Sequence, residues 1–197
     1  MKKRRATVKR RTKETDVSVS VDLDGRGESR IETGIGFFNH MLELFSRHSF
    51  IDLKIKVKGD LKVDEHHTIE DTAIALGEAI NKALGAKKGI NRFGYAIVPM
   101  DEALALAAVD LSGRAYTVVD AEFKQSKVQD TRTEIIPDFF KAFSDNCKCS
   151  LHIKLFYGRN EHHKVEAIFK AFARAMKIAG EIDRRGAGRI ASTKGIL

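Results

Sequence analysis

Residues that interrupt a chain or separate folded units are rare in this sequence. Only two prolines occur among 197 residues, and no segment rich in glycine and serine divides one part of the chain from another. Because domain boundaries usually fall in such linkers, we expect residues 1–197 to form a single compact domain. The sequence also lacks any apolar run near the ~20 residues that a membrane-spanning helix needs, so we expect no membrane partner.

Cysteine is equally scarce, which limits the possible metal and redox chemistry. The two cysteines, Cys147 and Cys149, form a CxC pair. In a strand such neighbours point to opposite faces, and a thiolate metal site needs more ligands, so we interpret them as two ordinary thiols. The basic start of the chain is followed by polar residues instead of the apolar core of a signal peptide, and we therefore expect a cytoplasmic protein.

Positive charge exceeds negative charge, which suggests an anionic partner. The net charge is +8, and eight of the first thirteen residues are Lys or Arg, a cluster that a solvated basic end explains most simply. The C-terminal stretch RRGAGRIASTKGIL combines glycines with cations and hydroxyls that suit phosphate, although a flexible tail has the same composition. Arg92 and Arg114 are further arginines near glycines, in positions where solvated turn residues are also common.

Only seven histidines occur, yet four of them stand in two adjacent pairs, each followed by a glutamate. The two sets are His66, His67 and Glu70, and His162, His163 and Glu166. On a helix the glutamate lies one turn from both histidines, whereas the adjacent histidines diverge by about 100°. One pair could be two surface histidines beside a solvated acid. Two copies favour a metal such as Mn, Fe, Co, Ni or Zn, with the two histidines of a pair serving different metals, or one metal and one substrate.

Other segments also recur, which predicts a duplicated unit. VDLDGRG at 21–27 resembles VDLSGRA at 109–115, and residues 40–57 align with residues 138–156. We therefore expect two pseudo-repeats, approximately 1–93 and 94–197. His40 falls opposite Asp138, so we predict two similar metal sites, each combining a histidine-pair helix with a ligand from the preceding helix.

Hydrophobic periodicity gives the same order of elements in both halves. Strands are predicted at 6–12, 16–23, 52–58 and 150–156, helices at 35–47, 68–83, 136–146 and 162–179, and β-structure across 95–123. This alternation predicts an α+β fold in which helices pack on mainly antiparallel or mixed sheets.

Seven motifs, taken in order, resemble those of the imidazoleglycerol-phosphate dehydratase family of histidine biosynthesis. They include GIGFFNHML, DEHHTIEDTAIALGEAI, PMDEALA, EHHKVEAIFKAFARAM and STKGIL. The resemblance runs from Glu14 to Leu197. It implies two tandem βαβ-type units of the ribosomal protein S5 domain 2-like class. It also implies a metal-dependent hydro-lyase that converts D-erythro-imidazole-glycerol phosphate to imidazole-acetol phosphate and water. Since no phosphatase-like segment is present, we expect the monofunctional form.

The resemblance further implies two Mn²⁺ ions per active site and a 24-subunit assembly with its active sites at subunit interfaces. The implied metal ligands are His40, His66, His67, Glu70, Asp138, His162, His163 and Glu166. Asp138 falls where many family members have histidine. The candidate catalytic bases are Glu14 and Glu166, which the sequence does not rank. The candidate substrate- or phosphate-binding residues are Glu14, His48, Arg92, Arg114, Lys170, Ser192, Thr193 and Lys194.

Two other classes of protein share some of these features. A dimetal hydrolase would also combine His/Glu pairs with basic phosphate-binding residues. An RNA-binding module would explain the net charge of +8, but the sequence has no aromatic pattern of the kind that stacks RNA bases, and both histidine pairs would remain unexplained. We therefore expect a small phosphorylated imidazole substrate and no nucleic-acid partner.

Overall fold

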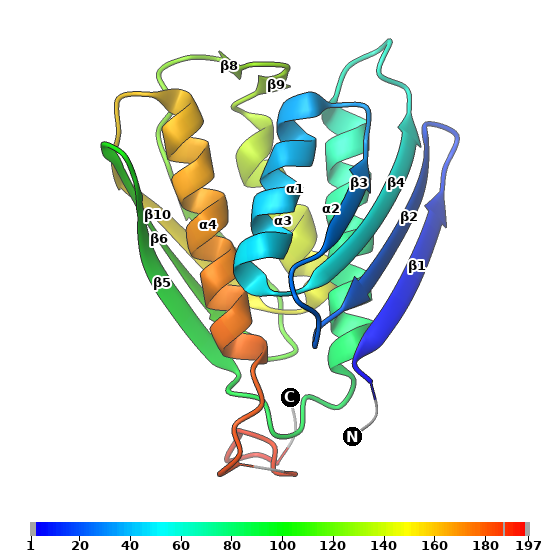
Figure 1. The fold of residues 1–197 in the computed structure, drawn as a ribbon, viewed down its shortest axis with the longest axis vertical. Helices are drawn as coiled ribbons and strands as arrows, with labels where there is room; N and C mark the ends of the chain where they lie inside the picture. Colours follow the sequence, from blue (N-terminus) through cyan, green and yellow to red (C-terminus); the bar gives the residue numbers. More distant parts are fainter. Residues whose placement is uncertain (1–2, 187, 196–197) are drawn as a thin grey trace.

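Four helices form the middle layer of the molecule between two four-stranded sheets (Figure 1). The computed structural model describes residues 3–186 and 188–195. The helices are α1 (Gly36–Ser49), α2 (His66–Leu84), α3 (Ile135–Cys147) and α4 (Glu161–Gly180). This arrangement confirms the expected α+β class with helices packed on mixed sheets.

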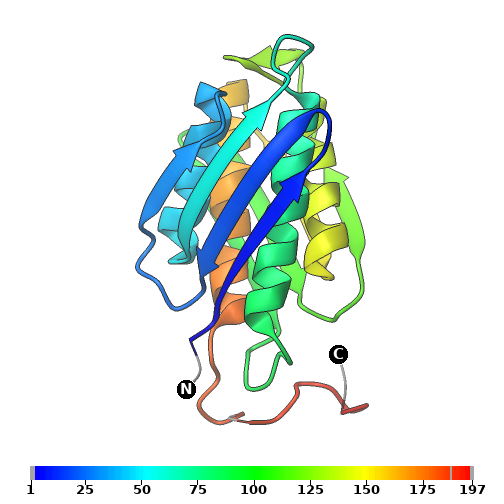
Figure 2. The same ribbon diagram turned by 90° about the vertical axis from the view of Figure 1, so that its right-hand side faces the viewer.

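The two sheets share one topology. The first has the order β1 (Arg5–Arg11), β2 (Thr15–Asp22), β4 (Asp52–Gly59) and β3 (Ser29–Glu32), and lies in front in Figure 2. The second has the order β5 (Phe93–Met100), β6 (Ala103–Asp110), β10 (Ser150–Tyr157) and β7 (Tyr116–Asp120). In each sheet the last pair is parallel and the other two pairs are antiparallel. This likeness supports the proposed duplication, whose boundary near residue 93 stays a prediction.

The main helices and strands lie where periodicity predicts them, to within a few residues at each end. Alternation is clearest in β2 and β6, where every second residue faces the helices and is buried. Periodicity did not predict β3, because this four-residue strand has no buried residue. It also did not predict the two-residue strands β8 (Lys127–Val128) and β9 (Thr131–Arg132).

The helices pair across the two halves of the chain. α1 packs against α4, where the rings of Phe45 and Phe172 stack with their centroids 5.0 Å apart. α2 packs against α3, and Gly77 makes this approach possible, because a Cβ atom there would lie 2.5 Å from the carbonyl oxygen of Phe143. The buried side chains of both halves therefore form one hydrophobic core.

The two cysteines occupy a helix end instead of a strand. Cys147 ends α3, Lys148 adopts a left-handed conformation with φ 55°, and Cys149 precedes β10. Both thiols are free and buried, as expected, but the premise that they point to opposite faces is wrong. A hydrogen bond with Cys149, together with burial, raises the pKa of Cys147, so the two thiols lie side by side in the core.

Among the described residues, no helix is both long enough and apolar enough to span a membrane.

Candidate metal centre and phosphate-binding end

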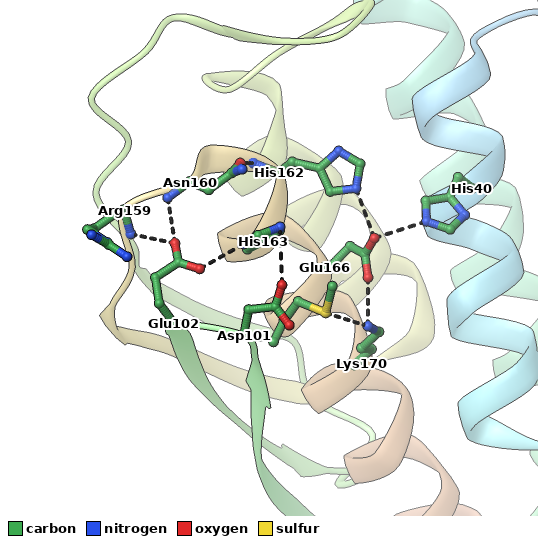
Figure 3. A network of polar contacts seen from close by, with 10 residues as sticks. His40, Asp101, Glu102, Arg159, Asn160, His162, His163, Glu166 and Lys170 are labelled. Atoms are coloured by element: carbon green, nitrogen blue, oxygen red, sulfur yellow. Dashed lines mark hydrogen bonds and ion pairs between the residues drawn. The ribbon is translucent and has the colours of Figure 1, made fainter.

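One cluster of metal-ligand side chains forms where α1 meets α4. We call His40, His162 and Glu166 the α1/α4 cluster (Figure 3). Oε1 of Glu166 lies 2.9 Å from Nε2 of His162 and 3.1 Å from Nε2 of His40. The three ligand atoms lie within 4.8 Å of one another. Two imidazoles and a carboxylate at this spacing match a donor set that divalent transition-metal ions accept.

The carboxylate of Glu166 is fully engaged in this cluster. Its second oxygen lies 2.6 Å from Nζ of Lys170, one turn further along α4, and its side chain is only 8% exposed. Burial alone would raise the pKa of Glu166. Hydrogen bonds from Lys170, His40 and His162 outweigh burial and lower the pKa to about 2, so Glu166 stays ionised and faces three donors.

A second cluster is more open and lies where α2 meets α3. Nε2 of His66 and Oε2 of Glu70 are 3.9 Å apart, and their side chains are 41% and 45% exposed. The hydrogen bond with Asp145 is the main cause of the raised pKa of Lys141, and the charges of Glu70 and Asp138 raise it further. Asp138 lies on α3, the helix that packs against α2. In the part of the chain that the structure describes, only the α1/α4 cluster brings three ligand atoms within 4.8 Å.

The pairing of these clusters corrects one prediction. We expected each histidine pair to take its extra ligand from the preceding helix, which would join His40 to α2. The structure instead joins His40 on α1 to His162 on α4, and α3, which carries Asp138, packs against α2. The reason is the crossed packing of the helices, which places α1 beside α4 and α2 beside α3.

Adjacent histidines diverge as the helical geometry predicts. In both pairs the ring centroids are 6.1 Å apart, and the ring planes meet at 86° in the first pair and 85° in the second. The first histidine of each pair faces the glutamate of its own helix. The second faces a carboxylate from a loop, since Nδ1 of His67 lies 3.0 Å from Asp60 and Nδ1 of His163 lies 2.7 Å from Glu102. The assignment of the two histidines to different metals stays a prediction.

Short polar side chains fix the start of both helices. Oδ1 of Asn160 accepts a hydrogen bond of 2.9 Å from the backbone N–H of His162. Oδ1 of Asp64 accepts one of the same length from the backbone N–H of His66. These contacts satisfy N–H groups that have no partner within the helix, and they hold each histidine pair in the first turn.

Sequence analysis missed Asp60 and Glu102 as partners of the second histidines. The pKa of Glu102 is lowered to about 2, mainly by the hydrogen bond from His163 and then by the backbone N–H groups of Asn160 and Arg159. A signal for Glu102 was present. It immediately precedes β6 as Glu14 precedes β2, and the shift of 88 from 14 to 102 equals the shift between the VDLDGRG and VDLSGRA motifs.

Glu14 and His48 lie near the two clusters but belong to neither. Oε2 of Glu14 is 3.9 Å from Nδ1 of His67, and the Glu14 side chain is 53% exposed. His48 lies two turns along α1 from His40. Burial and the nearby charges of Lys170 and Arg174 lower the pKa of His48, which favours its neutral form.

The remaining predicted phosphate-binding residues lie at the opposite end of the molecule. Arg92 precedes β5, binds Asp110 at 2.7 Å and donates to the backbone oxygen of Ala191 at 2.7 Å. Arg114 is exposed in the loop after β6. Residues 192–194 follow Ala191 in the C-terminal tail, which lies beyond the last turn of α4 (Figure 1). α4 has 20 residues and carries His162 in its first turn. A helix of that length spans about 30 Å, so one chain does not bring these residues to the α1/α4 cluster.

Comparison with known proteins places this sequence and fold in a family. The family model for imidazoleglycerol-phosphate dehydratase matches residues 33–176. The protein of that name from Clostridium acetobutylicum is 53% identical over 195 residues, which cover 99% of this chain and 98% of the relative. The histidine biosynthesis bifunctional protein HisB of Spirosoma linguale is 56% identical over 194 residues, but the match spans only 50% of its length.

Solved structures agree with these sequence matches. The crystal structure of imidazoleglycerol-phosphate dehydratase from Staphylococcus aureus superposes with a TM-score of 0.83 at 39% identity, covering 91% of this chain and 99% of the other. The Pyrococcus furiosus structure, a complex with (S)-C348, gives the same TM-score at 35% identity, covering 96% and 100%. The matches thus define the chain as a hydro-lyase with an α+β architecture. The chain belongs to the imidazoleglycerol-phosphate dehydratase family, whose enzymes act in histidine biosynthesis.

Proposed function

We propose that this chain is a metal-dependent dehydratase that converts D-erythro-imidazole-glycerol phosphate to imidazole-acetol phosphate and water. The observation that carries the metal dependence is the α1/α4 cluster, in which His40, His162 and Glu166 present three ligand atoms within 4.8 Å. The reaction removes one hydrogen and one hydroxyl group from adjacent carbons and leaves the phosphate in place. The free, buried thiols Cys147 and Cys149 suit the reducing cytoplasm, where we propose that the enzyme works.

The side chains present fit Mn²⁺, and we propose two ions per active site. The candidate ligands are imidazoles and carboxylates without a thiolate, a set that suits Mn²⁺ better than a structural zinc site. The candidates are His40, His66, His67, Glu70, Asp138, His162, His163 and Glu166. Because the two histidines of each pair face different ways, one pair would contribute to two ions. When bound, such an ion supplies Lewis acidity that makes an imidazole ring a better acceptor of electron density.

The surroundings of the two candidate bases differ, and this difference favours Glu14. Both oxygens of Glu166 are occupied by His40, His162 and Lys170, so we assign Glu166 to metal binding. Glu14 is 53% exposed and lies 3.9 Å from His67, so its carboxylate is free to approach a substrate. We propose that Glu14 either removes the proton from the carbon adjacent to the one that loses its hydroxyl group, or delivers a proton to the carbon beside the imidazole ring when the ketone forms.

The distance between the two ends of the molecule supports active sites at subunit interfaces. A backbone hydrogen bond from Gly89 to Arg189 and a hydrogen bond from the Arg92 side chain to the backbone oxygen of Ala191 anchor the tail at the far end of α4. Lys194 follows Ala191 by three residues, a reach of about 10 Å, against the roughly 30 Å length of α4. We therefore propose that the phosphate held by Arg92, Arg114, Ser192, Thr193 and Lys194 of one chain belongs to a substrate at the metals of another. A closed assembly of 24 subunits would supply this contact.

Product analysis with and without metal tests the proposed function. The purified chain is treated with a chelator, returned to Mn²⁺ or left without metal, and given the phosphorylated imidazole-glycerol substrate. We expect imidazole-acetol phosphate only with Mn²⁺, no release of inorganic phosphate, and a large loss of product in His40→Ala. Release of inorganic phosphate would instead indicate the dimetal hydrolase, and full activity after complete metal removal would contradict the proposal.

A further inference from the structure

We propose that Glu102 and Asp60 are positioning residues that keep Nδ1 of His163 and of His67 protonated, so that Nε2 of each ring is free to bind a metal ion. The inference rests on the proposed metal dependence and deepens it. A histidine that binds a metal through one ring nitrogen commonly donates its other N–H to a carboxylate, which fixes the orientation and the tautomer of the ring. Both second histidines of this chain have such a carboxylate.

Glu102 is itself held firmly, which makes it a rigid support. Its Oε2 lies 2.7 Å from Nδ1 of His163, and its Oε1 accepts hydrogen bonds from the backbone N–H groups of Arg159 at 2.9 Å and Asn160 at 2.7 Å (Figure 3). The two oxygens thus have different tasks: one holds the loop before α4, and the other holds the histidine. On its other side the ring is freer, since Nε2 of His163 is 3.6 Å from the exposed carboxylate of Asp101.

Asp60 meets His67 in a similar way but is held less firmly. Its Oδ2 lies 3.0 Å from Nδ1 of His67. Its Oδ1 is buried and has no hydrogen-bond partner among the described residues. Either oxygen of Asp60 could therefore face the histidine without loss of another contact, whereas Glu102 has only one way to satisfy all three of its donors.

The repeat explains why two different residues share this task. Glu14 and Glu102 occupy equivalent positions before β2 and β6. In the second half Glu102 contacts its histidine directly. In the first half Glu14 stands 3.9 Å away, beyond hydrogen-bond distance, and Asp60 makes the contact instead. One copy of the duplicated position thus supports a ligand, and the other is left free for the substrate.

Amide substitutions separate this role from a merely structural one. In Glu102→Gln the carbonyl oxygen must stay on the two backbone N–H groups, because the reversed amide would place NH₂ against two donors. The NH₂ group then faces His163, whose Nδ1 must accept, and the ring proton moves to Nε2, where it blocks metal binding. In Asp60→Asn the amide can turn its oxygen toward His67, and the tautomer is preserved.

Mn²⁺ binding to the full-length chain, measured by electron paramagnetic resonance of the free ion, tests the proposal without reference to activity. We expect Glu102→Gln to weaken Mn²⁺ binding by about 10- to 100-fold, the usual effect of removing such a partner, while the metal-free protein keeps the circular dichroism spectrum of the folded chain. Asp60→Asn should bind Mn²⁺ as the wild type does, whereas Asp60→Ala should bind more weakly.

The outcomes distinguish this inference from the proposed function. Tight Mn²⁺ binding by the wild type together with equally tight binding by Glu102→Gln and Asp60→Ala would overturn the positioning role alone. Equal weakening by Asp60→Asn and Asp60→Ala would overturn the tautomer argument, because only the alanine variant lacks an acceptor. A wild-type chain that binds no Mn²⁺ would overturn the proposed metal dependence, and this inference with it.

Discussion

Two inactive variants of this chain should restore each other's activity when they share an assembly. One variant, His162→Ala, loses the α1/α4 cluster, and the other, Ser192→Ala/Lys194→Ala, loses the phosphate-binding end. The two ends lie about 30 Å apart along α4, and the tail is anchored to Arg92 through Ala191. A site would therefore draw its metal ligands and its phosphate-binding residues from different chains.

The expected recovery follows from random mixing. In an equal mixture, half of the metal ends come from the tail variant and are intact, and half of the tails come from the histidine variant and are intact. If the two ends of a site belong to different chains, about one quarter of the sites have both ends intact. If they belong to the same chain, no site is intact at any mixing ratio.

The assay dissociates the two purified variants in mild denaturant, mixes them, reassembles them with Mn²⁺ and measures dehydration. Recovery near one quarter of wild-type activity is expected. The matched control mixes His162→Ala with Glu166→Ala, two changes in one cluster, and should recover nothing because no chain supplies an intact cluster. Activity of the first mixture no higher than that of this control would refute the placement of the site between chains.

Three further predictions concern the fold and its pH dependence. Phe140→Ala, at a fully buried ring 5.1 Å from that of Phe169, should lower the free energy of unfolding by about 3–5 kcal/mol in urea denaturation, and a loss below 1 kcal/mol would contradict the packing described. Gly94→Ala should cost about 1–3 kcal/mol in the same assay, because a methyl group there would overlap the carbonyl oxygen of Ala175 where β5 crosses α4. Glu102 has its ordinary pKa near 4.5 in the unfolded chain and about 2 in the fold, so its stabilising effect is complete above pH 4.5 and is lost as the pH falls toward 2. Glu102→Gln should therefore reduce the acid-induced loss of the urea midpoint, and an unchanged pH profile would show that the carboxylate is not stabilised by its contacts.

Much of the fold could be predicted because local pattern and tertiary structure agree. The period-2 burial of β2 and β6 and the helical stripes of α2 and α4 follow from sequence alone. The divergence of each histidine pair also followed, since it depends only on the rotation per residue of a helix.

The crossed packing of the helices could not be predicted in this way. The pattern of a single helix shows which face is buried but not which helix covers it, so His40 was assigned to the wrong partner. Asp60 and Glu102 were missed for a related reason. They lie in loops, where no periodicity marks them, and each acts on a histidine that is brought near by the tertiary fold.

The crossed packing also means that the α1/α4 cluster needs both halves of the chain. His40 comes from the first half, whereas His162 and Glu166 come from the second. On the other side, α2 of the first half carries His66 and Glu70 and packs against α3 of the second half, which carries Asp138. An ancestral single unit would have needed a second copy of itself to bring these side chains together. Fusion of two copies would make that contact intramolecular, and would leave equivalent positions such as Glu14 and Glu102 free to acquire different tasks.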